Sequence, residues 1–401
     1  MIDRMQLGEV PKKPHIAFRG PDGSLRFEEC FTRRGFEGEF SILYHEGPPM
    51  TDKAFSPSGP ICWGRQIAIP APQTQLKRRL ILGDRSPDGF TPILFSHDIV
   101  VSLYRIPAEA PSEVGFSNGD GDDLYFIFSG RATLETPLGD VEAEAGDYVL
   151  VPRGLIHRFR IHETIQGIVF ELRGGFHLPA SFRNPVGQLR MDAPYTHRDF
   201  KRPVFNGPRD GPTEILVKKG DQFARRTPAC SPFDVVGWDG TVWPFAFPIL
   251  NFQPKTGLVH LPPTIHTTFA ARGAVICSFV PRLTDTHAEA IPCPYPHASV
   301  DCDEIIYYVK GNFTSRKGVG PQSVSLHPSA VPHGPHPGSY EESIGSRSTD
   351  ELAVMVDTFE PLQVTRQALA LEFDGYHDSW IERPDEEPGP ALRAGRDEPS
   401  Q

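Results

Sequence analysis

The feature that most constrains the fold of this chain is a short pattern that occurs twice. In the first copy, Asp123 precedes the six-residue run LYFIFS, and Gly130 follows it. In the second copy, Glu304 precedes the run IIYYVK, and Gly311 follows it. An acidic residue therefore opens a strand-like segment in each copy, and a glycine ends it. The repeat predicts two domains built on the same plan.

Each copy continues into a proline-led turn that ends in a histidine. Residues Pro152–His157 read P-x-G-x-x-H, and Pro328–His333 read P-x-A-x-x-H. In a small antiparallel barrel or jelly roll, the acid and the histidine of one copy would face each other at the barrel mouth. The pattern resembles the two motifs of the cupin superfamily, H-x-H-x(3,4)-E-x6-G and P-x-G-x2-H. The resemblance implies a bicupin, an all-β (β-rich) chain with few short helices and two jelly-roll or β-sandwich domains.

The composition favours the same fold class. The 401 residues include 42 prolines and 37 glycines, a content typical of a chain with many turns and few long helices. One short helix is expected at residues 364–371. The polar, proline-bearing stretch 190–212 separates two sets of apolar runs and is the best candidate for a linker.

We expect the chain to divide into three parts. Residues 1–225 would form an N-terminal cupin-like β domain that serves as a metal-free scaffold. Residues 226–382 would form a C-terminal cupin domain with the metal site. The tail, residues 383–401, is charged, rich in proline and nearly devoid of large apolar residues, so we expect it to be disordered.

Charge and hydropathy exclude several classes of protein. The net charge of −11 argues against non-specific nucleic-acid binding, which needs a positive surface. No run approaches the ~18 apolar residues of a membrane-spanning helix, and the first residues lack the apolar core of a signal peptide. The six cysteines form no CxxC pair, which fits reduced thiols. We therefore expect a cytoplasmic protein with no nucleic-acid partner and no membrane association.

The two copies differ in one residue that matters for metal binding. Seven residues before Glu304 stands His297, whereas Phe116 stands seven residues before the acid of the first copy. The second copy therefore offers His297, Glu304 and His333, a set of two histidines and one carboxylate. Such a set leaves coordination positions open and suits non-haem Fe(II), which must also bind substrate and O₂. The first copy lacks one ligand, and we expect it to be a scaffold.

The spacing of this set places a condition on the backbone. Residues His297 and Glu304 are separated by an odd number, so a straight strand would place their side chains on opposite faces. His297 must then lie in the proline-flanked turn before the strand. Asp303 has the right parity with His297 and is a rival ligand. We prefer Glu304 because the x6-Gly frame selects it.

Longer stretches carry a closer resemblance. Three of them are SLHPSAVPHGPHPGSYEESIG (Ser325–Gly345), PYPHASVDCDE (Pro294–Glu304) and SPFDVVGWDG (Ser231–Gly240). The segments Gly35–Pro49 and Thr349–Phe359 add weaker cues. Together they resemble the homogentisate 1,2-dioxygenase family, especially its shorter bacterial form, over most of the chain except the tail.

In that family the iron ligands are a histidine two residues after a tyrosine, the glutamate that shortly follows, and the histidine of a P-H-G-P motif. The resemblance carries these roles onto His297, Glu304 and His333, the residues that the barrel pattern also selects. It implies an Fe²⁺ cofactor, a small aromatic substrate with O₂, and a homo-oligomer, because the family is hexameric. The implied reaction cleaves homogentisate to maleylacetoacetate in the catabolism of tyrosine and phenylalanine.

The resemblance also implies catalytic and substrate-binding residues. The family histidine that acts as acid and base is carried by His260, and His266, six residues on, is a rival. A second family histidine falls on His327, which with Tyr295 is implied to bind the substrate. A family cation near the substrate carboxylate matches Arg316, which fits a solvated loop arginine equally well.

One departure bears on the substrate. After the strand glycine this chain has Asn312 and Phe313, where better-known family members have His-Tyr. A phenylalanine cannot donate the hydrogen bond that a tyrosine offers. This keeps open a cupin dioxygenase of another para-diphenol, such as gentisate, hydroquinone or a substituted homogentisate. A non-catalytic bicupin that binds a small molecule is the alternative from another class.

Overall fold

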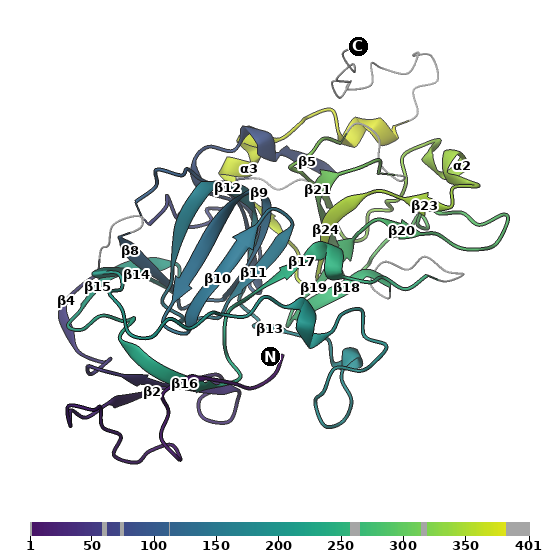
Figure 1. Cartoon of the computed structure of the whole chain (residues 1–401). Helices are drawn as coiled ribbons and strands as arrows, with labels where there is room; N and C mark the ends of the chain where they lie inside the picture. The colour runs from purple at the N-terminus through teal and green to yellow at the C-terminus, as the bar shows by residue number, and fades with distance from the viewer. Residues whose placement is uncertain are drawn as a thin grey trace, which may run out of the picture.

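The computed structural model describes residues 2–57, 62–72, 76–111, 113–256, 265–313 and 319–381. The described chain consists of β-sheets joined by turns and short helical segments (Figure 1). Its two α-helices are α2 (Ser339–Ser343) and α3 (Arg366–Leu371). The prediction of an all-β chain with few short helices and two jelly-roll or β-sandwich domains is confirmed.

The larger of the two main sheets builds the first barrel. It has eight antiparallel strands among the described residues. In spatial order they are β17 (Phe245–Pro248), β11 (Asp147–Val151), β9 (Asp122–Thr136), β12 (Arg158–Leu172), β7 (Ile99–Ile106), β6 (Gly89–Phe95) and β25 (Gln363–Val364), with β10 (Gly139–Glu144) beside β9.

The second main sheet contains the matching strand of the second copy and lies beside the first (Figure 1). In spatial order its seven described strands are β13 (Phe176–His177), β18 (Thr267–Ala271), β19 (Ala274–Phe279), β24 (Leu352–Thr358), β21 (Asp303–Lys310), β22 (Ser323–His327) and β5 (Arg79–Leu82).

Smaller sheets and turns of 3₁₀-helix complete the described fold. The first four-stranded sheet has the order β1 (Met5–Gly8), β16 (Val235–Gly240), β3 (Phe40–His45) and β2 (Phe27–Thr32). The second has the order β4 (Asp52–Ser56), β15 (Gln222–Pro228), β14 (Glu214–Lys219) and β8 (Val114–Asn118). A two-stranded sheet pairs β20 (Arg282–Leu283) with β23 (Ser348–Thr349). The 3₁₀ segments are η1 (Gly83–Arg85), η2 (Ala180–Phe182), η3 (His197–Asp199), η4 (Ile249–Asn251) and η5 (His377–Trp380).

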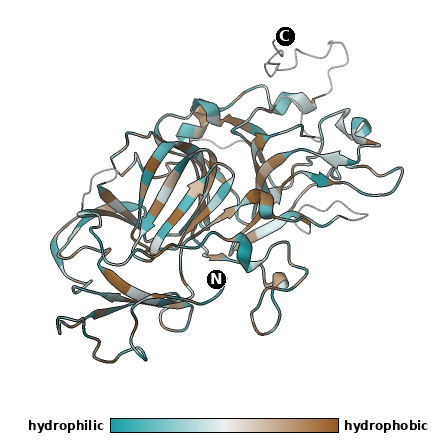
Figure 2. Cartoon of the chain, viewed as in Figure 1, coloured by the Kyte–Doolittle hydropathy of each residue, from teal (hydrophilic) through white to brown (hydrophobic). Residues whose placement is uncertain are grey.

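Strand β21 shows how the sequence places one sheet between two cores. Its odd-numbered apolar residues, such as Ile305 and Tyr307, belong to the large core that is shared with the first barrel. Its even-numbered residues Ile306 and Tyr308 belong to a smaller core on the opposite face. Successive side chains of a strand point to opposite faces, so a strand with a core on each side is apolar at nearly every position. Figure 2 shows hydrophobic residues, in brown, along the strands, with more hydrophilic residues, in white and teal, between them.

The sequence repeat corresponds to a structural repeat. The glycines that end the two matching strands, Gly130 and Gly311, have φ angles of 90° and 97°, a conformation that favours glycine. In the proline-led turns, Gly154 has a φ of 82° and Ala330, at the matching position, a φ of 63°. The backbone therefore turns in the same way in both copies, although only one of the turns has a glycine.

The short helix expected at residues 364–371 is found as α3. The Thr365 side chain accepts a hydrogen bond from the backbone N–H of Ala368 (3.1 Å), as threonine does at helix N-termini. This helix follows β25, which pairs with β6 of the first barrel. Conversely, β5, which comes from the N-terminal part of the chain, pairs with β22 of the second main sheet.

Each part of the chain, residues 1–225 and residues 226–382, thus contributes a strand to the main sheet of the other part. The division of the chain into these two domains stays a prediction. The tail, 383–401, lies outside the described residues. Among the helices that the structure describes, none has the length and hydropathy needed to cross a membrane.

Candidate metal centre

Two histidines of the second barrel are brought together by their own backbones. The N–H of His297 donates to the carbonyl of His333, and the N–H of His333 donates to the carbonyl of His297, each at 2.7 Å. This isolated antiparallel bridge joins the turn before β21 to the turn after β22. The two imidazole rings lie with their centroids 4.4 Å apart. The condition that His297 precede the strand is therefore met by the backbone.

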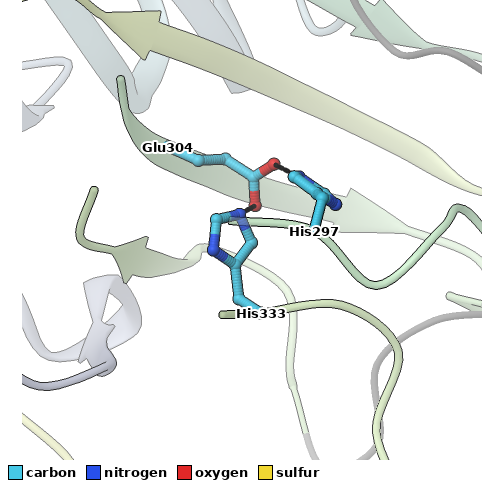
Figure 3. A group of neighbouring side chains, drawn as sticks. All are labelled: His297, Glu304 and His333. Carbon is cyan, nitrogen blue, oxygen red and sulfur yellow. Dashed lines mark ion pairs between the residues drawn. The ribbon is translucent and has the colours of Figure 1, made fainter. Parts of the chain in front are cut away.

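The carboxylate of Glu304 lies beside both imidazoles. Glu304 is the second residue of β21 and is 5% exposed. Its Oε2 is 3.9 Å from Nε2 of His297, and its Oε1 is 3.9 Å from Nε2 of His333. Figure 3 shows the three side chains converging from one strand and two turns. The ligand atoms of all three lie within 4.8 Å of one another.

Backbone carbonyls orient the two rings toward the carboxylate. Nδ1 of His297 is 2.7 Å from the carbonyl oxygen of Tyr295, and Nδ1 of His333 is 3.0 Å from that of Val331. A carbonyl oxygen only accepts hydrogen bonds, so Nδ1 carries the hydrogen in each ring. In the neutral ring Nε2 then offers its lone pair toward Glu304. Histidine ligands of metals are typically oriented by such a hydrogen bond.

This donor set fits a divalent transition metal. Two atoms that each lie about 2.1 Å from one ion are at most about 4.2 Å apart, and both histidine–carboxylate separations are below that limit. Two imidazoles and one carboxylate are the ligands of non-haem Fe(II) sites that keep open positions. A metal would also offset the cost of burying the Glu304 charge.

The rival ligand Asp303 faces a different part of the molecule. Its Oδ1 accepts from the N–H of Ser329 and its Oδ2 from the N–H of Leu362, each at 2.7 Å. The first barrel repeats this arrangement, since Asp122 accepts from the N–H groups of Arg153 (2.6 Å) and Phe176 (2.7 Å). The aspartate therefore ties the strand start to two neighbouring turns.

His327 is buried directly behind the carboxylate. It is the last residue of β22, pairs with Glu304 across the sheet and is 0% exposed. Its Nδ1 is 2.7 Å from Oε1 of Glu304, and its Nε2 is 3.1 Å from the hydroxyl of Tyr376. Both ring nitrogens are thus engaged within the protein. The substrate-binding role that we expected for His327 stays a prediction, and the geometry favours support of the carboxylate.

The other expected site residues are distributed differently. His260 and Arg316 lie outside the described residues. The rival His266 is fully buried and stacks on Phe279, with ring centroids 4.3 Å apart. The side chain of Tyr295 is half exposed and lines a cavity of about 390 Å³. The backbone carbonyl of Tyr295 therefore belongs to the candidate metal centre, because it bonds to His297. The substrate-binding role of the Tyr295 side chain stays a prediction.

Phe313 contributes to the apolar wall of the second barrel. Its ring packs edge-on against Tyr308, with centroids 4.7 Å apart, and it adjoins the smaller core. The Tyr308 hydroxyl pairs with Ser325 at 3.0 Å. Position 313 therefore contributes only hydrocarbon, next to a tyrosine whose own hydroxyl is hydrogen-bonded.

Another acid on the same sheet face escaped the motif search. Asp357 of β24 pairs with Glu304 across the sheet, so both side chains leave the sheet on one face. Burial and, to a smaller extent, the charge of Glu304 together raise the pKa of Asp357 to about 7. No spacing in the sequence relates Asp357 to the ligands, because it comes from a strand some fifty residues further along the chain.

The first barrel has the same backbone frame without the third ligand. Phe116 and His157 form the bridge that corresponds to the two histidines of the second barrel, with N–H to carbonyl distances of 2.8 and 2.9 Å. Nδ1 of His157 is 3.0 Å from the carbonyl of Leu155, as in the second copy. Burial and, to a smaller extent, the charge of Arg65 together lower the pKa of His157 to about 3.

A guanidinium fills the space where this frame could hold an ion. Arg65 lies over the rings of Phe90 and Phe116, 3.9 and 4.2 Å from their centroids. Its Nη2 is 3.2 Å from Oδ2 of Asp123, and it also contacts the hydroxyl of Tyr125. Burial raises the pKa of Asp123 to about 6, although the charge of Arg65 opposes this rise. A protein cation therefore stands beside the acid of the first copy.

A second cluster of carboxylates near this barrel is also compensated by a cation of the protein. Asp120, Glu171 and Asp221 offer oxygens close to one another. The amine of Lys218 lies 2.6 and 2.7 Å from the two oxygens of Glu171, and 3.3 Å from an oxygen of each aspartate. This lysine supplies the compensating charge.

Comparison with known proteins assigns both halves of the chain. The homogentisate 1,2-dioxygenase N-terminal model matches residues 89–249, and the homogentisate 1,2-dioxygenase C-terminal model matches residues 255–386. A protein of Saccharolobus solfataricus named "putative dioxygenase" is 33% identical over 95% of this chain and 99% of its own length. The homogentisate 1,2-dioxygenase of Rhizobium rhizogenes is 28% identical over 85% of this chain and 77% of its own length.

Other matches are shorter or more distant. The homogentisate 1,2-dioxygenase of Bradyrhizobium diazoefficiens is 30% identical over 66% of this chain and 62% of its own length. Among solved structures, a cupin 2 conserved barrel domain protein from Leptotrichia buccalis matches with a TM-score of 0.34 and 10% identity, over 75% of this chain and 100% of that chain. On the two family models and the full-length relative, the chain belongs to the homogentisate 1,2-dioxygenase family.

Proposed function

We propose that this protein is an Fe(II)-dependent dioxygenase that opens the ring of homogentisate with O₂ to give maleylacetoacetate, in the catabolism of tyrosine and phenylalanine. The observation that carries the proposal is the convergence of His297, Glu304 and His333 in the second barrel. Membership of the family supports the substrate. Both atoms of O₂ enter the product, so the reaction needs no added reductant.

The side chains of His297, Glu304 and His333 would hold the metal. When bound, Fe(II) would supply a Lewis acid with open positions for a diphenol and O₂. The carbonyls of Tyr295 and Val331 fix the hydrogens of the two imidazoles on Nδ1, which keeps Nε2 free to act as the donor atom. Both ligand histidines must be neutral, so metal binding should weaken in mild acid.

The protein must also move a proton from the substrate hydroxyl. We assign this step to His260, because the family resemblance carries the acid/base histidine to that position and a neutral imidazole titrates in the right range. Replacing His260 with Ala should leave iron content unchanged and lower the rate by at least ~10²-fold. His266→Ala is the matched variant. If His266→Ala loses the rate and His260→Ala keeps it, the two roles are exchanged.

A second substrate is favoured by one observation. Phe313 packs against Tyr308 and presents hydrocarbon, where better-known family members have a tyrosine hydroxyl. A para-diphenol that needs no hydrogen bond at this position, such as gentisate, hydroquinone or a substituted homogentisate, would fit as well. The two possibilities differ in the diphenol, whereas the metal and the reaction type are shared.

Oxygen uptake by the full chain tests the proposal. The protein is reconstituted with Fe(II) without oxygen, its iron content is measured, and O₂ consumption is followed with homogentisate, gentisate and hydroquinone. We expect one iron per chain and the fastest uptake with homogentisate. Faster uptake with another diphenol would replace homogentisate as the substrate. Absence of bound iron, or of uptake with every diphenol, would contradict the proposed function.

A further inference from the structure

A chain of two hydrogen bonds supports the carboxylate of the metal centre from behind. The Tyr376 hydroxyl is 3.1 Å from Nε2 of His327, and Nδ1 of His327 is 2.7 Å from Oε1 of Glu304. Tyr376 is 4% exposed, His327 0% and Glu304 5%. Water therefore has little access to either bond, and in such surroundings hydrogen bonds are stronger than at the surface.

The direction of both bonds follows from the chemistry of the groups. An ionised carboxylate only accepts, so Nδ1 of His327 donates its hydrogen to Glu304. In the neutral imidazole Nε2 is then the acceptor, and the hydroxyl of Tyr376 donates to it. The donations run from Tyr376 through His327 to Glu304. Each group has one orientation that satisfies its neighbours, so the position of Glu304 is coupled to Tyr376.

The tyrosine is itself held in an aromatic cluster. Its ring packs edge-on against Trp380, with centroids 5.0 Å apart, and Trp380 stacks on His336 at 4.0 Å. Nε2 of His336 is 2.9 Å from the hydroxyl of Ser379. The guanidinium of Arg78 lies over the Trp380 ring at 4.8 Å and contacts the carbonyl of Pro332, next to a ligand histidine. The tyrosine hydroxyl is therefore presented by a packed segment.

The first barrel provides an internal comparison. Its strand pairing places Val151 opposite Asp123, where the second barrel places His327 opposite Glu304. A valine can neither donate to the acid nor accept from a tyrosine. The supporting histidine is thus present in the barrel with three ligands and absent from the barrel whose acid faces Arg65.

We propose that Tyr376 is a positioning residue of the metal centre, which acts through His327 to hold the Glu304 carboxylate in the orientation that binds the metal. The inference rests on the metal site of the proposed function and is independent of the identity of the diphenol. Loss of a residue that orients a metal ligand typically lowers metal affinity 10- to 100-fold. Tyr376 touches neither metal nor substrate, so we do not count it as catalytic.

Metal affinity without substrate tests the inference. Co²⁺ is titrated into the metal-free full chain, and both the dissociation constant and the visible spectrum of bound Co²⁺ are recorded. For Tyr376→Phe we expect affinity to fall about 10-fold or more and the spectrum to change, because the carboxylate binds differently. The matched control is Tyr308→Phe, which removes a buried hydroxyl that bonds to Ser325. This control should leave affinity and spectrum unchanged.

A double-variant cycle separates positioning from a general loss of packing. His327→Val introduces the residue that the first barrel has at the matching position, and we expect it to lower Co²⁺ affinity at least as much as Tyr376→Phe. Combining the two should cause no further loss, because Tyr376 acts only through His327. Thermal unfolding of each variant reports on the fold.

The outcomes distinguish this inference from the proposed function. Unchanged Co²⁺ affinity and spectrum in Tyr376→Phe would overturn the inference, as would additive losses in the double variant or an equal loss in Tyr308→Phe. Absence of Co²⁺ binding by the wild-type chain would overturn it too. If the variants behave as expected and no diphenol is consumed by the iron form, the inference stands and the proposed function fails.

Discussion

At the scale of single residues, two neighbouring acids at the start of β21 have opposite tasks. Glu304 faces His297 and His333, while Asp303 accepts two backbone N–H groups on the other side. The sequence frame of acid, six residues and glycine was sufficient to prefer Glu304. It could not reveal the task of Asp303, because the partners of that residue come from turns that are distant in sequence.

We predict that Glu304→Ala and Asp303→Ala fail in different ways. Glu304→Ala should lose tight iron binding and still fold, because neither hydrophobic core contains this side chain. Asp303→Ala should be destabilised by about 2 kcal/mol or more, since two buried N–H groups lose their acceptor. Iron content and urea unfolding are measured for both. Full iron and full turnover in Glu304→Ala would show that it is not a ligand.

Arg65 is the residue that sequence reasoning missed in the first barrel. No local pattern connects it to Asp123, and only the fold brings the guanidinium between the rings of Phe90 and Phe116. Its effect is to compensate a buried acid in a barrel that lacks a ligand histidine. The scaffold role of this barrel stays a prediction, and Arg65 supplies a physical reason for it.

We predict that Arg65→Met lowers the free energy of unfolding by about 3–5 kcal/mol, the usual cost of leaving one partner of a buried ion pair alone. Urea denaturation of the full chain measures it. Arg131→Met is the control, because the pair of Arg131 with Glu163 is 3.7 Å long and exposed on both sides. The control should change stability by less than about 0.5 kcal/mol. An equal effect of both substitutions would refute the compensating role.

At the scale of elements, the strands with clear sequence patterns were the predictable ones. The runs at β9 and β21 are bounded by an acid and a glycine and buried on both faces. The pairing partners were not predictable, because β5 and β25 are short and carry no signal that assigns them to a sheet. The aromatic segment around Tyr376 was missed for the same reason.

One sheet of the N-terminal region depends on a charged histidine. His45 of β3 bonds to Asp234, just before β16, at 2.6 Å and to Glu29 of β2 at 3.0 Å. Burial alone would lower the pKa of His45, but the two carboxylates outweigh it and raise the pKa to about 9. The histidine thus links three strands in its charged form.

We predict that this link makes stability fall as pH rises. A histidine with a pKa near 6.5 when unfolded and about 9 when folded stabilises fully below pH 6.5, and this contribution is lost as pH rises to 9. The loss would be on the order of 3 kcal/mol. Unfolding free energies at pH 6 and pH 9.5 are compared for wild type and His45→Gln. Equal pH dependence in the two proteins would contradict the prediction.

At the scale of the whole molecule, each barrel includes a strand from the other half of the chain. Strand β5, from the first hundred residues, forms the edge of the sheet that carries Glu304. Near it, Lys77 and Arg79 pair with Glu372 beyond α3. The sequence repeat correctly indicates two barrels. It does not indicate that each half of the chain contributes a strand to the barrel of the other half.

We predict that residues 226–382 expressed alone do not form the metal site. Without β5, the strand β22 that ends in His327 would become an unpaired edge, and Glu372 would lose both cations. Circular dichroism, Co²⁺ titration and proteolysis of the fragment test this, with the full chain as control. A folded fragment that binds Co²⁺ as tightly as the full chain would show that the second barrel is autonomous.

The pairing of Leu82 in β5 with Ser323 in β22 also sets an order of events during synthesis. Strand β5 leaves the ribosome before its partner β22, which lies about 240 residues further along the chain. Until β22 is synthesised, β5 cannot form this pairing. Closure of such distant pairs is slow and leaves edges open to wrong partners. The candidate metal site can thus be completed only after β22 has been synthesised, so we expect a metal to bind late in maturation.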